Sequence, residues 1–215
     1  MVRITKVHTG GGDGGETSLV DGTRIAKSDL RMEMVGTCDE LNACLGIVAM
    51  EANRLNEIAE DGGARPTVRQ VRNVISKVIG RLHHELFDLG AELSIPINNE
   101  NMEMLERTKI TEKQIERLEN EIDQLNANLS DLESFILPGG TLASSYLHLA
   151  RTVVRKAERL MVKMDNLEKN SVSDTALKYI NRLSDLLFVA ARYANQSDIG
   201  GTGDVLWKPG SSREE

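Results

Sequence analysis

Apolar residues recur at spacings of three and four along five segments of this chain, and this period constrains the fold more than any other feature. In residues 30–52 it is carried by Val35, Cys38, Leu41, Leu45 and Val48. Such spacing gathers apolar side chains on one face of an α-helix. Aromatic residues are only 3% of the chain, which suits helix-on-helix packing better than a β-sandwich. The predicted fold class is all-α.

Proline, glycine and capping residues mark the limits of the other predicted helices. The second helix follows Pro66, because proline is favoured at the first helical position, and it runs to Leu93. Thr111 and Gln114 form a capping box, so Thr111 is the expected N-cap of the third helix. The last two helices are expected at residues 142–164 and 174–195. A linker through Pro96 and the polar stretch INNENMEM separates the second helix from the third. Because the connections between the five helices are mostly short, the sequence predicts an antiparallel five-helix bundle.

The chain of 215 residues divides into three parts that we expect to form a single domain. Residues 1–28 are rich in Gly, Thr and Asp and are expected to form a loop region that could become ordered on binding. Residues 29–196 form the bundle. Residues 197–215 are Gly- and Ser-rich around Trp207 and are expected to be a partly disordered tail.

The net charge of −7 argues against general affinity for nucleic acid or anionic membranes. No apolar run approaches the roughly 20 residues that span a bilayer, and the N-terminus lacks the apolar centre of a signal peptide. We therefore expect a cytoplasmic protein, or one in the matrix of an organelle. Cys38 and Cys44 lie six apart in one helix, so they are expected to be small core residues without a mutual disulfide.

A second, polar line of side chains flanks the apolar face of residues 142–164. This polar stripe consists of Ser144, His148, Arg151, Arg155 and Glu158. Two arginines four residues apart repel each other slightly, and guanidinium groups grip phosphate well, so the stripe predicts a local polyphosphate site. A solvated charged face, with Glu158 neutralising the arginines, explains the same pattern equally well.

Three weaker signals stay open between function and structure. In the fifth helix one face carries polar and aromatic residues that suit a ribose, a base edge, a partner subunit or an interhelical hydrogen-bond network: Asn181, Asp185, Phe188, Arg192 and Asn195. The segment TGGGDGGETS could wrap an anion, with Lys27 nearby, although it lacks the pattern of a Walker A loop. Asp39 and Glu40 could act as bases, metal ligands or ion-pair partners, whereas His83 and His84 are expected to be core or interface residues.

Several of these segments together resemble the ATP:cob(I)alamin adenosyltransferases of the propanediol-utilisation type. The resemblance is ordered along nearly the whole chain and rests on TGGGDGGETSL, GTCDELNACLG, FILPGG, RTVVRKAER and YINRLSDLLFVAARYAN. It implies a homotrimeric five-helix bundle with each active site between two subunits. It further implies transfer of the 5′-deoxyadenosyl group of ATP to reduced cobalamin, with Mg²⁺ as the partner of the triphosphate.

The resemblance also implies roles for individual residues. Arg155 and Glu158 match positions at the triphosphate and its metal, and Asn181 matches a nucleotide contact. Arg151 matches an arginine paired across the subunit interface with the aspartate matched by Asp39. The residues that match the family's N-terminal ATP loop are Thr9, Gly12, Asp13, Gly15, Thr17 and Ser18. Lys27 matches the family's phosphate-contacting lysine.

For the corrinoid, the resemblance implies that Phe135 lies near the lower face of the ring and displaces the axial base, with Phe188 as a second contact. Cobalt(I) is then the nucleophile, so the protein mainly aligns it and stabilises the departing charge. This chain has Gly10, Gly11 and Gly14 where the family usually has basic or hydroxyl side chains. We therefore predict that backbone N–H groups bind more of the phosphate here and that the loop is disordered without ATP.

Two other classes of function compete with the enzyme. A nucleotide-sensing or chaperone-like trimer would bind ATP or deliver adenosylcobalamin without much turnover, and a purely structural bundle would not be stabilised by ATP. For the enzyme, a reductase and an adenosylcobalamin-dependent client enzyme are candidate partners.

Overall fold

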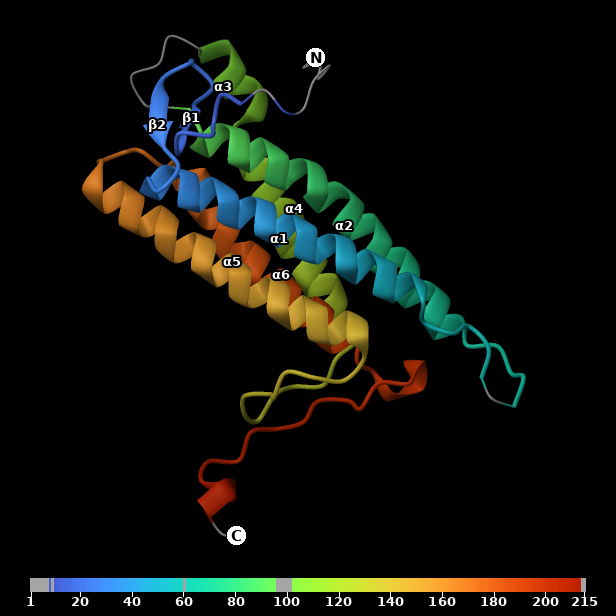
Figure 1. Cartoon of the computed structure of the whole chain (residues 1–215). Coiled ribbons are helices and arrows are strands. Elements are labelled where there is room, and N and C mark those ends of the chain that lie inside the picture. The colour runs from blue at the N-terminus through green and yellow to red at the C-terminus, as the bar shows by residue number, and fades with distance from the viewer. Residues whose placement is uncertain (1–7, 9, 60, 96–101, 214–215) are drawn as a thin grey trace.

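The computed structural model of the chain describes residues 8, 10–59, 61–95 and 102–213. Five long helices lie side by side, and each runs antiparallel to the next one along the chain (Figure 1). Helix α1 packs between α2 and α5, while α6 packs against both α5 and α4. The bounds are α1 (Leu30–Asn53), α2 (Pro66–Leu93), α4 (Glu112–Asn126), α5 (Leu142–Leu167) and α6 (Asp174–Tyr193). The predicted helical bundle is confirmed.

The core consists of the apolar faces that the spacing predicted. In α5, the apolar face expected for residues 142–164 is buried, and five residues at helical spacing along it are each at most 1% exposed: Leu147, Ala150, Val154, Ala157 and Met161. Cys38 is buried in the same core, and the half-buried Cys44 packs against this core. Both are free thiols. Each buried aliphatic side chain stabilises the fold by about 1.5–3 kcal/mol, so the helix faces together hold the bundle.

The helix starts follow from local chemistry. Pro66 is the first residue of α2, and the expected capping box joins Thr111 and Gln114 at the start of α4, where Thr111 N donates to Gln114 Oε1 at 2.8 Å. At α5 the hydroxyl of Thr141 accepts from Ser144 N at 3.1 Å. These bonds satisfy N–H groups that a helix start leaves open.

A buried polar cluster joins α2, α4 and α6 on the side away from α5. It is centred on Glu85, and we call it the Glu85 cluster. Glu85 accepts from Arg81 at 2.7 Å, from Arg117 at 3.0 Å and from the Tyr179 hydroxyl at 2.9 Å. Arg81 also pairs with Glu121. Every member of the cluster therefore has a charged or hydrogen-bonded partner within the bundle.

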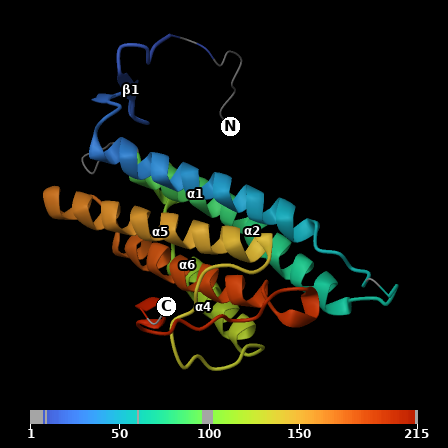
Figure 2. The ribbon, with the colours of Figure 1, turned by 60° about the horizontal axis from the view of Figure 1, so that its bottom comes forward.

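Two parts of the chain differ from the sequence prediction. The linker after Pro96 contains a short helix, α3 (Met102–Thr108). The N-terminal region contains a hairpin of β1 (Glu16–Ser18) and β2 (Arg24–Ala26), in which Thr17 faces Ile25. The hairpin stands at the end of the bundle where α1 begins (Figure 2). Strands of three residues are too short to show a period in the sequence.

The C-terminal segment is also more ordered than expected, because it pairs with the loop between α4 and α5. Leu137 N donates to Val205 O at 2.8 Å, and Trp207 N donates to Phe135 O at 2.7 Å. We call residues 134–137 and 205–207 the Phe135–Trp207 ribbon. None of the helices in the described part of the chain combines the length and the apolar character of a membrane span.

Candidate active site

The polar stripe lies along α5, and its members differ in burial. Ser144 and His148 are buried, Arg151 and Glu158 are half-buried, and Arg155 is exposed. The interpretation as a solvated face therefore fits Arg155 but is wrong for Ser144 and His148.

Three atoms of the polar stripe are buried without a hydrogen-bond partner among the residues that the structure describes. They are Ser144 Oγ, His148 Nδ1 and Arg151 Nε, which follow one another along α5. A buried polar atom without a partner destabilises a fold by about 1–3 kcal/mol. Burial lowers the pKa of His148, and the positive charge of Arg151 lowers it further. Burial also lowers the pKa of Arg151, with a smaller contribution from the Arg155 charge. This surface is thus polar, cationic and incompletely satisfied within one chain.

The C-terminal half of the polar stripe meets α6. Asn181 Nδ2 donates to Glu158 Oε1 at 2.9 Å, and Arg182 donates to Asn181 Oδ1 at 2.9 Å. Burial raises the pKa of Asp185, and the neighbouring Glu158 carboxylate adds to this rise while Arg155 opposes it. The fold therefore brings Arg155, Glu158 and Asn181 together, with Asp185 beside them. This group offers a cation, an amide and two acids to a ligand.

An open aromatic hollow of about 570 Å³ adjoins the other half of the polar stripe. Its aromatic lining is Phe135, Phe188 and Trp207. Phe135 is 79% exposed, and its ring centre is 6.3 Å from that of Trp207. The Phe188 ring lies 6.3 Å from His148, edge to face, and the Arg151 guanidinium carbon lies 6.0 Å from its centre. Phe188 therefore connects the hollow with the polar stripe.

The residues of the polar face predicted on the fifth helix fall into two groups, one exposed and one hydrogen-bonded within the fold. Asn181 and Asp185 are exposed beside the polar stripe. Arg192 instead donates to Asp204 at 2.8 Å and to Ser130 O at 2.6 Å. Asn195 accepts from Thr141 N at 3.2 Å and donates to Gly203 O at 2.8 Å. For these last two residues the hydrogen-bond network is the correct interpretation, and it anchors the segment that carries Trp207.

The Gly-rich loop turns back on the hairpin around Lys27. Gly10 and Gly15 have φ of +73° and +84°, which side chains other than glycine rarely adopt. Lys27 N donates to Gly15 O at 2.9 Å, and a Cβ on Gly12 would lie 2.9 Å from Lys27 Nζ. Asp13, Thr17 and Ser18 belong to the same hairpin and loop, whereas Thr9 lies outside the described residues.

Arg24 of β2 contacts this loop, and sequence reasoning missed it. Its guanidinium donates to Gly11 O at 2.9 Å and to Ser18 Oγ at 3.2 Å. An arginine three residues before Lys27 was the available signal, because a second cation beside a glycine-rich turn reinforces an anion site.

One chain does not bring all predicted residues together. Asp39 is exposed on α1 in a groove with Phe87, and it forms no ion pair with Arg151 or with any other described residue. Its neighbour Glu40 pairs with Lys156 at 3.3 Å, so the ion-pair interpretation holds there. His83 is half-buried against Asn42, and His84 is exposed. Within the described ranges no three His, Cys, Asp or Glu side chains cluster in a way that could hold a metal ion.

The comparisons with known proteins agree on one family. A family model described as cobalamin adenosyltransferase matches residues 7–194. The chain belongs to this family. The corrinoid adenosyltransferase of Mycobacterium tuberculosis is 40% identical to it over 213 residues, which are 99% of this chain and 97% of that protein. The Mus musculus corrinoid adenosyltransferase is 33% identical over 206 residues, covering 96% of this chain and 78% of that protein.

Solved structures give the same result. A variant of the PduO-type ATP:corrinoid adenosyltransferase of Lactobacillus reuteri, complexed with cobalamin and ATP, matches with a TM-score of 0.77 and 32% identity. The match covers 94% of this chain and 99% of that chain. The resemblance inferred from the sequence segments is confirmed.

For this cobalamin adenosyltransferase family member, Trp207 is the aromatic residue of the hollow to which the sequence analysis assigned no role. The tail was expected to be partly disordered, whereas its backbone pairing places Trp207 against Phe135. The available signal was a lone tryptophan in the segment DVLWKPG, where large apolar residues stand out from a polar tail.

Proposed function

We propose that this chain transfers the 5′-deoxyadenosyl group of ATP to cob(I)alamin on the surface formed by α5, α6 and the Phe135–Trp207 ribbon. One observation carries the proposal. A cationic half and an aromatic half adjoin at Phe188, with the Arg151 guanidinium 6.0 Å from its ring centre. A polyanionic nucleotide and a broad apolar corrin ring need such half-sites side by side. Family membership and the ATP:corrinoid adenosyltransferase neighbours support the same activity.

The triphosphate binds at Arg155, with Asn181 as a further nucleotide contact. An exposed guanidinium suits a bidentate grip on phosphate oxygens. Glu158 holds Mg²⁺. The residues fit this ion, because Mg²⁺ is commonly bound by one or two carboxylates together with substrate phosphates, and Glu158 has Asp185 beside it. When bound, Mg²⁺ neutralises phosphate charge.

In the transfer step the electron pair of cobalt(I) attacks the 5′ carbon of ATP. The Co–C bond forms as the C5′–O bond breaks, and triphosphate leaves with the bonding electrons. No proton needs to move, so the side chains align the two substrates and stabilise the departing charge. We assign the stabilisation of the departing triphosphate charge to Arg155.

The N-terminal loop closes over the triphosphate of ATP. Lys27 supplies a charge, and backbone N–H groups around Gly12, Asp13 and Gly15, with the hydroxyls of Thr17 and Ser18, supply hydrogen bonds. Because Gly10, Gly11 and Gly14 lack side chains, the loop depends on its backbone and is disordered until ATP binds. Amide hydrogen exchange in residues 10–15 should therefore slow when ATP is added. Equal exchange with and without ATP contradicts this role.

Phe135 and Phe188 form the corrin contact, and Phe135 displaces the lower axial base so that cobalt becomes four-coordinate and easier to reduce. The exposure of Phe135, at 79%, supports this role, because a large apolar side chain held in solvent suits an apolar ligand. The spectrum of bound cob(II)alamin tests it, since Phe135→Ala should restore the signal of the five-coordinate species.

The active protein is a homotrimer in which Asp39 of one subunit pairs with Arg151 of the next. The unpartnered Arg151 Nε and the exposed Asp39 carboxylate support this arrangement. Sedimentation should give the mass of three chains, and Asp39→Ala should weaken the trimer. A monomeric active enzyme would refute the pairing. The proposed partners of the enzyme are a reductase that supplies cob(I)alamin and a client enzyme that accepts adenosylcobalamin.

The decisive experiment mixes the protein with Mg-ATP and chemically reduced cobalamin. The corrin spectrum should change to that of adenosylcobalamin, with one triphosphate released for each cobalamin converted. A chaperone-like trimer instead raises its melting temperature with ATP but releases no triphosphate. A structural bundle shows neither effect. Either of these two outcomes would refute the proposed transfer.

A further inference from the structure

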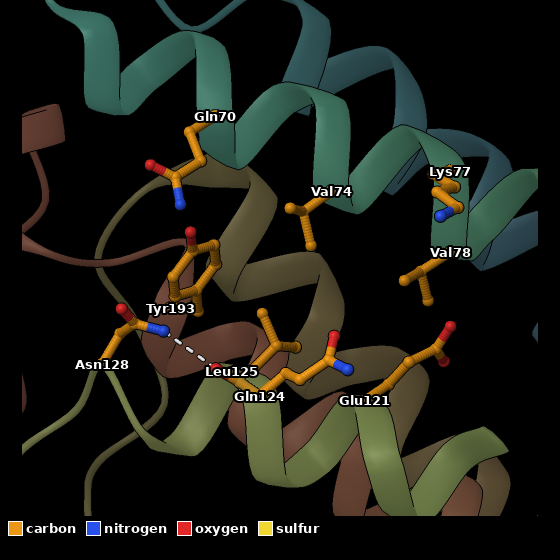
Figure 3. A pocket seen from close by; sticks show the side chains of 9 residues that line it. All are labelled: Gln70, Val74, Lys77, Val78, Glu121, Gln124, Leu125, Asn128 and Tyr193. Carbon is orange, nitrogen blue, oxygen red and sulfur yellow. Dashed lines mark hydrogen bonds between the residues drawn. The ribbon is translucent and has the colours of Figure 1, made fainter.

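Two buried polar side chains at the end of α6, Arg192 and Asn195, hold the Phe135–Trp207 ribbon in place. They are 5% and 7% exposed, and both bond to the loop before α5 and to the C-terminal tail. Tyr193, which lies between them in the sequence, instead faces a pocket between α2 and α4 (Figure 3). The two polar side chains thus form a connection of their own, which we call the α6 anchor.

Arg192 connects the loop between α4 and α5 with the tail. Its guanidinium donates to Ser130 O at 2.6 Å and to the Asp204 carboxylate at 2.8 Å. Ser130 comes shortly before ribbon residues 134–137, and Asp204 comes directly before residues 205–207. Because one rigid, planar guanidinium bonds to both, it fixes the starts of the two ribbon strands relative to each other.

Asn195 makes the same kind of connection at the other end of residues 134–137. Its side-chain oxygen accepts from Thr141 N at 3.2 Å and from Thr202 N at 3.1 Å. Its amide nitrogen donates to Gly203 O at 2.8 Å. The first strand of the ribbon is therefore held on both sides, and the second strand is held where it begins.

Two glycines allow the loop and the tail to approach Asn195 closely. A Cβ on Gly140 would overlap the Asn195 amide, and a Cβ on Gly201 would overlap the Asn195 backbone. Gly140 also has φ of +89°, which other residues rarely adopt. Both segments are thus shaped to fit against this one asparagine.

The α6 anchor is bonded to the aromatic half of the site alone. Among the described residues, the side chains of Arg192 and Asn195 bond only to the loop and the tail. Arg155 and Glu158 of the polar stripe make no bond to either of them, and Glu158 is held by Asn181 instead. The position of the ribbon can therefore change while the proposed ATP contacts stay in place.

We propose that Arg192 and Asn195 are positioning residues for adenosyl transfer, which hold Phe135 and Trp207 where the corrin ring binds. The inference rests on the proposed function, because it takes the aromatic hollow as the corrin site. The two residues touch neither substrate and act through the ribbon. An anchor with a structural role alone would stabilise the bundle without a selective effect on cobalamin.

The first test needs no substrate, because Trp207 is the only tryptophan of the chain and its fluorescence reports the ribbon. Asn195→Ala removes the bonds of its side chain to the loop and the tail, and Asp204→Ala removes the carboxylate that Arg192 binds. In both variants the emission should shift to longer wavelength and acrylamide should quench it more strongly, because Trp207 leaves Phe135 and enters water. Unchanged emission and quenching in both variants overturn the proposal.

Steady-state kinetics then separates the two substrates. Each variant should raise the KM for cobalamin by about tenfold, the loss expected for one or two hydrogen bonds, and should leave the KM for ATP within about twofold. Bound cob(II)alamin should also show more of the five-coordinate signal, because Phe135 is no longer held. An equal rise of both KM values overturns the proposal. An unaltered chain without transfer refutes the proposed function itself, whereas an unchanged KM for cobalamin in active variants refutes only the role of the anchor.

The matched control is Asp198→Ala, which removes an exposed acid from the segment between α6 and the ribbon. It should keep the emission and both KM values of the unaltered chain. Circular dichroism shows whether each variant is folded, and Asp204→Ala, which lies outside the bundle helices, carries the test if Asn195→Ala does not fold. Loss of the helical signal in Asp204→Ala overturns the proposal, because the anchor would then hold the bundle and not the ribbon.

Discussion

The Glu85 cluster and the polar stripe contain similar residue types, but they differ in whether their polar atoms have hydrogen-bond partners. The Glu85 cluster buries Glu85 and Tyr179 between α2, α4 and α6, with the half-buried Arg81 and the exposed Arg117 paired to Glu85, and each has a partner. The polar stripe of α5 also buries polar groups, yet Ser144 Oγ, His148 Nδ1 and Arg151 Nε have none among the described residues. The first group is complete within one chain, whereas the second is not.

We propose that this difference separates a structural polar group, the Glu85 cluster, from a functional one, the polar stripe. A satisfied cluster fixes how helices pack, and nothing further needs to bind there. A buried polar cluster whose atoms lack hydrogen-bond partners leaves the fold less stable than an apolar surface would. Such a cluster persists where substrates or a second subunit supply the missing partners. Charge and residue type alone could not make this distinction, because both groups contain arginine and glutamate side chains.

The largest expected effect removes the centre of the satisfied cluster. Glu85→Ala leaves Arg81 and Arg117 without their shared carboxylate and Tyr179 without its acceptor. Breaking a buried ion pair in this way should lower the free energy of unfolding by about 3–5 kcal/mol. Urea denaturation followed by circular dichroism measures it.

The matched control is Glu116→Ala, which removes an exposed acid of α4 and should change the free energy of unfolding by at most about 0.5 kcal/mol. A loss at Glu85 no larger than that of the control means that the cluster does not hold the helices together.

A smaller effect is expected in the aromatic hollow. Trp207→Ala removes the ring that packs against Phe135 and should raise the KM for cobalamin by about tenfold, in line with about 1.4 kcal/mol for one aromatic contact. The KM for ATP should not change, because the polar stripe is intact. Steady-state kinetics with each substrate varied in turn measures both. An equal rise of the two KM values would show that the ribbon acts on the whole site instead.

The smallest effect concerns pH. Burial and the Arg151 charge lower the pKa of His148, while Asp204 opposes them. His148 is therefore neutral in the folded chain at a pH where the unfolded chain, with an ordinary histidine pKa of about 6.5, takes up a proton. Stability contributed in this way is present above pH 6.5 and is lost as the pH falls below it. In His148→Gln the free energy of unfolding should fall less steeply between pH 7 and 5. An unchanged slope contradicts the assignment.

Much of the bundle could be predicted because its signals are local. The capping box at Thr111 and the proline at the start of α2 involve residues within one helical turn, and both are found where expected. The apolar face of α5 depends only on the helical period. The split of the α6 face was not predictable, because Arg192 meets Asp204 only after the tail folds back.

What the sequence missed depends on distant pairing or on very short elements. The Phe135–Trp207 ribbon joins segments about 70 residues apart in the chain, and nothing in either segment specifies the other. Helix α3 has seven residues and the strands three each, so neither shows a period. The resemblance to a family supplied most of the expected site residues, while the structure showed which of them one chain brings together.

The most direct test of the account is the rate of adenosyl transfer in Arg155→Ala. Arg155 is exposed and stabilises no described contact through its side chain, so the free energy of unfolding should stay within about 0.5 kcal/mol. The value of kcat/KM should fall by on the order of 10² or more, since a cation is lost beside the departing triphosphate. Lys163→Ala, an exposed cation further along α5, should retain full activity. A rate for Arg155→Ala within a few-fold of the unaltered chain would contradict the claim that the polar stripe is the active surface.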